Sequence, residues 1–240
     1  GIVIAALYGW LGREPVRGAS DQVEQTATRA TVAGLFRNPA FLAGTFGLAA
    51  LTFAMGGIST WVPTFLHRFA RLSVGMASQT VSAITVVDGI AGTLVGGWIA
   101  QRWLRTDHRA LYLLSFWSVA LTLPFGALVF FGPPKWAIPS LFAAEFFLFL
   151  NTGPLNAAIV NSVSAPVRAT AVSINLFCIH FFGDTFSPQI IGAISDRTGS
   201  LRFGLGATLI SLVVSCAILL AGARFAPPLD GDQGVAGSAH

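Results

Sequence analysis

Ionisable side chains occur inside long apolar segments of this sequence. Asp88 lies near the middle of the second such segment, Glu145 lies in the fourth, and His180 and Asp184 lie together in the fifth. A charged group at the centre of a lipid bilayer costs about 2.5–3.5 kcal/mol on insertion scales, so a chain keeps one there only where other groups compensate for it. Because these groups fall near the same depth of their segments, the sequence predicts a polar cavity between helices.

His180 and Asp184 are four residues apart, a spacing that places both on one face of a helix. Ser173 and Ser187 fall on the same face, so we expect a polar stripe turned toward the protein interior or toward water. A carboxylate beside an imidazole can accept, hold and release a proton. In the structural alternative, Asp184 only hydrogen-bonds a neighbouring helix and His180 only fills a wet gap. We predict no metal site and no cofactor, because no second pair of ligands is visible.

The fourth apolar segment adds amide side chains to Glu145. Glu145 and Asn156 are eleven residues apart, close to three helical turns, and therefore share a face. Gly153-Pro154 lies between them and is expected to kink the helix, as in many transporters. Asn151 and Asn156 are candidate binding residues, and the alternative is that their amides only join neighbouring helices.

The composition indicates a membrane protein. Of the 240 residues, 54% are hydrophobic and 10% are charged, whereas a soluble domain carries about 25% charged residues. This excludes a soluble enzyme, a disordered chain and a nucleic-acid-binding protein. A span needs about 20 apolar residues, and the strand-type alternation of a barrel is absent. We therefore predict an all-α membrane protein with six helical spans, at residues 41–66, 77–100, 110–131, 136–163, 169–194 and 203–223.

Glycine and proline patterns indicate how the helices pack. Gly92 and Gly96 form a GxxxG motif, which lets two helices approach closely. Pro63, Pro124 and Pro188 are expected to add kinks.

Flanking segments suggest that the chain is part of a longer protein. Residues 1–10 read as the end of a preceding span, 11–40 as a cytoplasmic linker, 41–225 as a six-helix bundle and 226–240 as a disordered cytoplasmic tail. The second half of the linker fits either a plain solvated linker or a short surface helix, capped by Ser20 or Asp21, with Leu35 and Phe36 touching the membrane. With this topology, nine of the 14 Lys and Arg lie on the side of the C-terminus and five on the other, which favours a cytoplasmic C-terminus.

The connection after the second segment resembles a family signature. Gly97-Trp98-Ile99-Ala100-Gln101-Arg102-Trp103-Leu104-Arg105 is similar to the short-loop motif Gly-x-Leu-Ala-Asp-Arg-x-Gly-Arg of the major facilitator superfamily. Gln101 replaces the acidic residue of the motif, and Leu104 replaces a glycine. The resemblance implies a structural or gating role for Gly97 and Arg102, through a cytoplasmic charge clamp that Gln101 would weaken.

The fifth segment resembles the Spinster-like branch of that superfamily. The eleventh helix of this branch carries His-x-x-Gly-Asp-x-x-Ser-Pro-x-x-Ile-Gly-x-x-Ser-Asp, and this sequence matches it at the positions His180, Gly183, Asp184, Ser187, Pro188, Ile191, Gly192, Ser195 and Asp196. Residues 13–18 and 61–66 also resemble the branch. The resemblance implies structural or gating roles for Gly183, Ser187, Pro188 and Asp196.

The resemblance covers nearly the whole chain, as helices seven to twelve of a twelve-helix transporter. It implies alternating access, an N-terminal six-helix half as the partner, and an amphiphilic substrate of the lysophospholipid or sphingolipid type, moved across the membrane with protons. A multi-pass protein of the bacterial inner membrane fits this description.

Two alternatives remain open. A general drug or organic-anion carrier of the same superfamily would share these features. A membrane-embedded enzyme is disfavoured, because the sequence contains neither Gly-x-Ser-x-Gly nor His-Glu-x-x-His.

Overall fold

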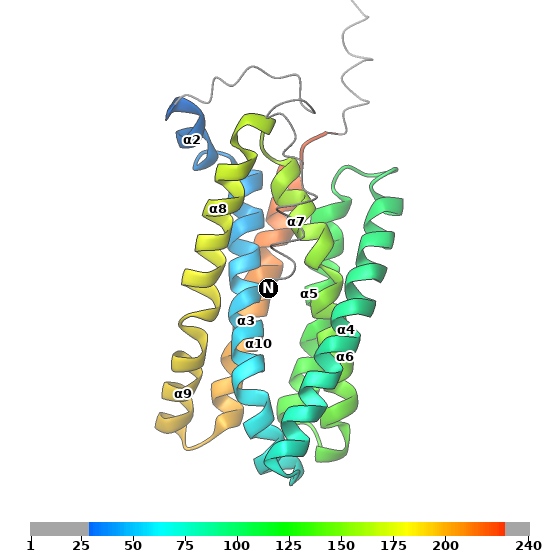
Figure 1. The fold of residues 1–240 in the computed structure, drawn as a ribbon, viewed down its shortest axis with the longest axis vertical. Helices are drawn as coiled ribbons and strands as arrows, with labels where there is room; N and C mark the ends of the chain where they lie inside the picture. Colours follow the sequence, from blue (N-terminus) through cyan, green and yellow to red (C-terminus); the bar gives the residue numbers. More distant parts are fainter. Residues whose placement is uncertain (1–28, 229–240) are drawn as a thin grey trace, which may run out of the picture.

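The computed structural model describes residues 29–228 and forms a bundle of long helices running side by side (Figure 1). The α-helices are α2 (Arg29–Leu35), α3 (Pro39–Ala70), α4 (Val74–Trp103), α5 (Ala110–Phe131), α6 (Ala137–Leu150), α7 (Thr152–Asn161), α8 (Arg168–Cys178), α9 (Ser187–Thr198) and α10 (Leu201–Gly222). Short 3-10 turns are η1 (Pro134–Trp136), η2 (Ala165–Val167) and η4 (Ala223–Phe225), and a π-helical segment, η3, covers Ile179–Asp184.

Six stretches of the described residues are long and apolar enough to cross a membrane, which confirms the six predicted spans. The spans begin and end within a few residues of the predicted limits. The fourth span consists of η1, α6 and α7, and the fifth consists of η2, α8, η3 and α9. The protein is therefore an all-α, multi-pass membrane protein.

Helix α3 lies at the centre of the packing and runs beside α10 (Figure 1). Asn38 starts α3, because its side-chain oxygen accepts from the backbone N–H of Phe41 at 3.1 Å. The Ser215 hydroxyl of α10 donates to the carbonyl of Gly47 at 2.8 Å. The Tyr112 hydroxyl of α5 donates to the carbonyl of Ala40 at 2.7 Å. These bonds from α5 and α10 hold α3 in place, and other residues of α3 line the candidate site described below.

The GxxxG motif allows close helix packing, as predicted, and the structure shows that the helix packed against it is α6. A Cβ atom added to Gly92 would lie 2.7 Å from the carbonyl oxygen of Phe146, and one added to Gly96 would lie 1.8 Å from that of Leu150. Both glycines are therefore needed for the close approach of the two helices.

The predicted kink of the fourth span is confirmed at Asn151, where α6 ends and α7 begins. Pro154 has no N–H to donate to the carbonyl of Leu150, so the helical ladder is interrupted there. Pro63 and Pro124, in contrast, lie within α3 and α5, which continue through them.

The predicted surface helix is present as α2, but the expectation for Leu35 is wrong. Leu35 is 3% exposed and packs in the bundle core, because the chain turns back into the bundle after α2, whereas Phe36 is 60% exposed. The proposed caps Ser20 and Asp21 lie outside the described residues, as do the predicted span end at residues 1–10 and the tail beyond residue 228.

Candidate functional site

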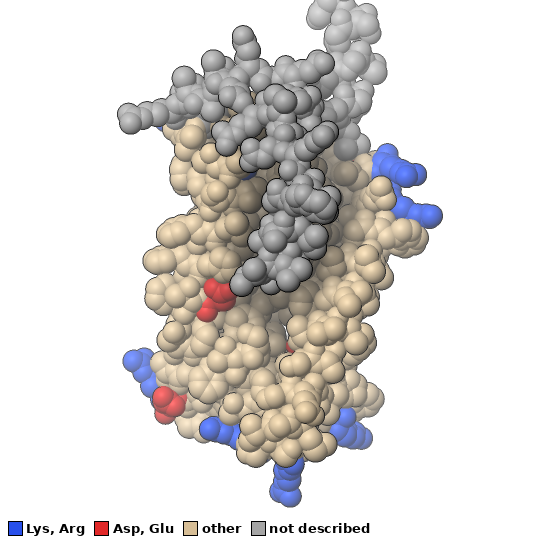
Figure 2. Space-filling view, in the orientation of Figure 1, with Lys and Arg blue, Asp and Glu red and all other residues tan. Residues whose placement is uncertain are grey.

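Basic residues gather at the two ends of the bundle, where the spans leave the membrane. On the face seen in Figure 2, Lys and Arg lie at the ends and not in the middle. Three acidic residues, in contrast, lie well inside spans: Asp88, Glu145 and Asp184. These carboxylates and His180 are the groups that the sequence singled out.

Glu145 lies on α6 and faces α4. It is 4% exposed, and its Oε2 accepts a hydrogen bond of 2.7 Å from the Thr85 hydroxyl. A cavity of about 60 Å³ adjoins it, lined by Met55, Ile58, Ser59, Thr85, Glu145, Leu148 and Phe149. The carboxylate therefore lies between an apolar wall and two hydroxyl groups.

Asp88 follows Thr85 by three residues on α4, and hence lies about one turn from the Thr85–Glu145 bond. Its side chain is fully buried, and neither carboxylate oxygen has a hydrogen-bond partner among the described residues. Buried polar atoms without a partner are rare in folded proteins. Asp88 therefore remains a candidate for a site that exchanges a proton or binds a ligand.

Thr85→Val is expected to destabilise the bundle by about 1–3 kcal/mol, because it leaves the buried Glu145 carboxylate without its donor at nearly constant side-chain volume. Thr93→Val is the matched control: Thr93 is half-buried on the same helix, and its hydroxyl makes no side-chain hydrogen bond within residues 29–228. Thermal unfolding of both variants in detergent checks this. Equal midpoints would show that the Thr85 bond contributes no net stability.

His180 and Asp184 are in contact, as their spacing predicts. His180 Nδ1 lies 3.0 Å from Asp184 Oδ2, with the side chains 63% and 38% exposed. Both belong to η3, where the backbone N–H of Thr185 bonds the carbonyl of His180 five residues back. Single π-helical turns of this kind are often found at functional sites.

The residues of the predicted polar stripe differ in exposure. Ser173 and His180 are exposed, but Ser187 is fully buried. Ser187 lies with Asp184 on the side of the span that packs against Gly56 of α3, so this end of the stripe faces the protein interior. Pro188 lacks an N–H for the carbonyl of Asp184, and the Ser187 hydroxyl donates to that carbonyl instead at 3.4 Å.

The Gly-Asp-x-x-Ser-Pro run packs against α3. A Cβ on Gly183 would lie 2.9 Å from Cβ of Thr52, and a Cβ on Gly56 would lie 2.7 Å from both Asp184 Cβ and Ser187 Oγ. The indole N–H of Trp61 donates to the carbonyl of Pro188 at 2.9 Å. The motif thus brings the fifth span close to α3 and holds Asp184 at their junction.

A second cavity, of about 360 Å³, opens at this junction, lined by Thr52, Met55, Gly56, Ser59, Thr60, Asp184 and Pro188. Met55 and Ser59 line both this cavity and the one beside Glu145. Helix α3 therefore separates two carboxylates that belong to different spans. Our sequence reasoning missed the α3 hydroxyls; the recurrence of Thr and Ser within an otherwise apolar span was the signal that could have indicated them.

The amides of the fourth span differ in position. Asn151 is fully buried and donates to the carbonyl of Leu148 at 2.7 Å, while its Oδ1 has no partner in the described part of the chain. Asn156 is exposed and donates to the carbonyl of Thr152. Asn156 lines neither cavity, and the break at Asn151 separates it from Glu145.

Comparison with known families identifies the architecture. The family model described as Major Facilitator Superfamily matches residues 1–188. The chain belongs to this superfamily. Curated relatives include protein spinster homolog 1 of Xenopus tropicalis, which is 30% identical over 82% of the chain and 41% of the relative. Sphingosine-1-phosphate transporter SPNS2 of Danio rerio is 30% identical over 76% of the chain and 40% of the relative. The predicted Spinster-like resemblance is confirmed.

Solved structures agree on the fold. A bacterial homologue of the human lysosomal transporter Spinster, in an inward-facing and unoccupied conformation, superposes with a TM-score of 0.70 at 20% identity, over 94% of this chain and 57% of that one. The transporter FucP in its outward conformation gives a TM-score of 0.73 at 16% identity, over 95% and 52% of the two chains. The chain spans about two fifths of the length of the curated relatives. The family and these relatives are transporters, which speaks against a membrane-embedded enzyme.

The superfamily loop motif lies at the end of α4. The Arg102 guanidinium stacks 4.7 Å from the centre of the Trp98 ring and pairs with no carboxylate among residues 29–228. A side chain at Gly97 would meet open space. Asp196 lies exposed near the far end of α9, away from the two cavities. Roles of these residues in gating remain predictions.

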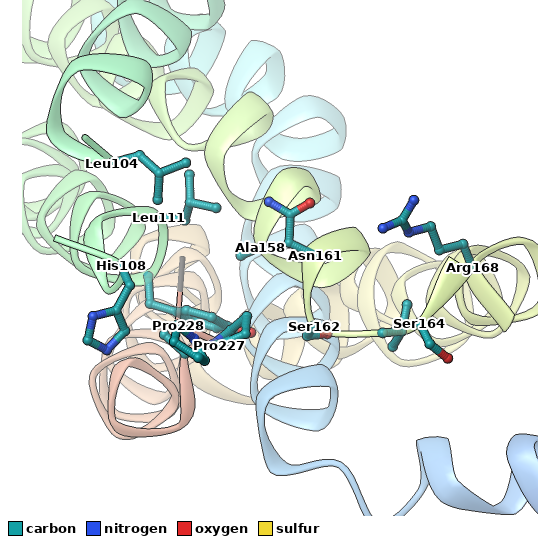
Figure 3. Close-up of a pocket in the computed structure, with 13 residues that line it drawn as sticks. Leu104, His108, Leu111, Ala158, Asn161, Ser162, Ser164, Arg168, Pro227 and Pro228 are labelled. Atoms are coloured by element: carbon teal, nitrogen blue, oxygen red, sulfur yellow. The ribbon is translucent and has the colours of Figure 1, made fainter. Parts of the chain in front are cut away.

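A third cavity, of about 450 Å³, lies where the α4–α5 and α7–α8 connections meet the end of α10 (Figure 3). His108 and Arg168 approach it from opposite sides, and Pro227 and Pro228 line it between them (Figure 3). No residue lining it was among the predicted site residues. Within the described residues, no group of three or more His, Cys, Asp or Glu is arranged to hold a metal ion.

Proposed function

We propose that this chain is the C-terminal six-helix half of a secondary transporter that moves a lipid-like amphiphile across the membrane by alternating access, coupled to protons. The observation that carries the proposal is the set of three membrane-embedded carboxylates around α3, two of which line cavities. The relatives named as a sphingosine-1-phosphate transporter and as a probable sphingolipid transporter of Arabidopsis thaliana support the substrate class.

In this proposal the two cavities belong to one wall of the substrate path, and an N-terminal six-helix half supplies the other wall. Glu145 and Asp88 hold or exchange protons. The His180–Asp184 pair contacts the substrate or a proton, with Asn151 and Asn156 as further contacts. Residues 41–225 form the bundle, and residues 11–40 form the linker between the halves. The basic bias of nine to five supports a cytoplasmic C-terminus, and we place the protein in a bacterial inner membrane.

Transport in proteoliposomes tests the proposal, with the bundle joined to its N-terminal half. A fluorescent lysolipid should enter when a pH gradient is imposed and should stop entering when a protonophore collapses the gradient. His180→Ala should lower this uptake, and wild-type uptake in this variant at every pH would remove His180 from the mechanism. Uptake of organic anions without uptake of lysolipids would instead favour the general organic-anion carrier.

A further inference from the structure

The membrane-embedded part of this bundle carries negative groups and no permanently positive ones. All 14 Lys and Arg lie in connections, in the segments flanking the bundle, or within about one helical turn of a span end. Asp88, Glu145 and Asp184 lie deeper in their spans. A ligand group that reaches the membrane-embedded middle of the bundle therefore meets a negative electrostatic potential.

The cavity beside Asp184 offers more hydrogen-bond acceptors than free donors. The Thr52 hydroxyl already donates to the carbonyl of Leu48 at 2.8 Å, and the Ser59 hydroxyl donates to that of Gly56 at 3.0 Å. Their hydrogens are thus occupied, which leaves oxygen lone pairs for a ligand. No Lys, Arg or His of residues 29–228 lines this cavity. Of the two Asp184 oxygens, Oδ2 faces His180, and Oδ1 takes part in no hydrogen bond with the described residues.

We propose that this cavity binds the amine of an amphiphile, as a primary ammonium group held by Asp184 and by the α3 hydroxyls. An ammonium group supplies three donors and one positive charge, which matches a carboxylate and a set of acceptor oxygens. A phosphate would meet like charge here, and among the described lining residues only Thr60 keeps a free hydroxyl hydrogen. The inference rests on the proposed function and deepens it, because it assigns a charge to the part of the substrate that reaches this site.

The span that carries Asp184 also offers an exposed apolar surface. Phe181 contacts Phe177, Phe182 and Phe186, with ring centres 5.3, 5.1 and 5.5 Å apart. These rings are partly exposed and belong to the turns that carry His180 and Asp184. An alkyl chain attached to the bound amine can pack along them.

Binding to the full-length protein in lipid nanodiscs tests the charge preference. The probes are a long-chain primary alkylamine, its uncharged N-acetyl derivative and the alkyl phosphate of the same chain length, each competing against the radiolabelled amine. We expect the amine to bind about tenfold or more tightly than the N-acetyl derivative and the alkyl phosphate. A difference of this size is what one charge-assisted hydrogen bond contributes to binding. Asp184→Asn should remove this preference and leave the affinity for the N-acetyl derivative unchanged. Asp107→Asn, at a half-buried carboxylate in the α4–α5 connection, should have no effect.

Thr60→Ala keeps the inference testable if the Asp184 variant misfolds. Thr60 is exposed, and its replacement leaves the His180–Asp184 pair intact. It should weaken amine binding about threefold. Tighter binding of the alkyl phosphate, or an unchanged amine preference in Asp184→Asn, would overturn the inference. Lysolipid transport measured on the same preparations separates the two proposals: transport without amine preference contradicts only this inference, and amine preference without transport contradicts only the proposed function.

Discussion

Gly96→Ala is expected to lower the free energy of unfolding by about 1–3 kcal/mol, although alanine favours helices more than glycine does. The reason is that the added methyl group would lie 1.8 Å from the carbonyl oxygen of Leu150. That oxygen belongs to the backbone just before the break at Asn151, so it cannot rotate away as a side chain would. Helices α4 and α6 must therefore move apart.

Gly89→Ala on the same helix is the control, because the nearest atom to its added methyl group is 3.9 Å away, on the Phe149 ring. It should be neutral or more stable by up to ~1 kcal/mol, from helix propensity alone. A thiol-reactive dye can follow thermal unfolding, since Cys216 is buried and Cys178 is half-buried. If both variants unfold at the same temperature, α4 and α6 do not pack as closely as described.

Glu145→Gln is expected to reduce proton-driven transport by about tenfold or more, which corresponds to a coupling free energy of ~1.4 kcal/mol. The glutamine carbonyl can still accept the Thr85 hydrogen bond, so the local packing is kept while the exchangeable carboxyl proton is lost. Exchange of labelled substrate without a pH gradient should continue at close to the wild-type rate.

The readout that identifies coupling is the dependence of uptake on the imposed pH gradient. In Glu145→Gln this dependence should flatten, whereas Asp107→Asn should keep the wild-type dependence, since Asp107 lies outside the spans. Loss of both driven uptake and exchange would assign Glu145 to substrate binding instead. An unaltered gradient dependence would exclude it as the proton carrier.

The spans were predictable from the sequence because each is a long apolar run, and their limits follow from where polar residues resume. The contact between His180 and Asp184 was predictable because four residues span one helical turn. The close packing at Gly92 and Gly96 followed from the absence of side chains. These inferences depend on local spacing, which the sequence contains directly.

The π-helical turn at η3 was not predictable from α-helical spacing, and neither was the burial of Ser187 against α3 while Ser173 and His180 stay exposed. The α3 hydroxyls were overlooked because Thr and Ser are common in spans, and only the approach of the fifth span at Gly56 and Gly183 turns them toward a carboxylate. Leu35 was placed in the membrane because the return of the chain after α2 depends on tertiary contacts.

Because Met55 and Ser59 border both cavities, the occupants of those cavities share a wall. Any shift of these two side chains that follows binding beside Asp184 also changes the surroundings of Glu145. Thermodynamic linkage makes such an influence reciprocal: if substrate alters proton affinity at one cavity by some factor, protons must alter substrate affinity at the other by the same factor. A single turn of α3 would then be the physical basis of energy exchange between ion and solute.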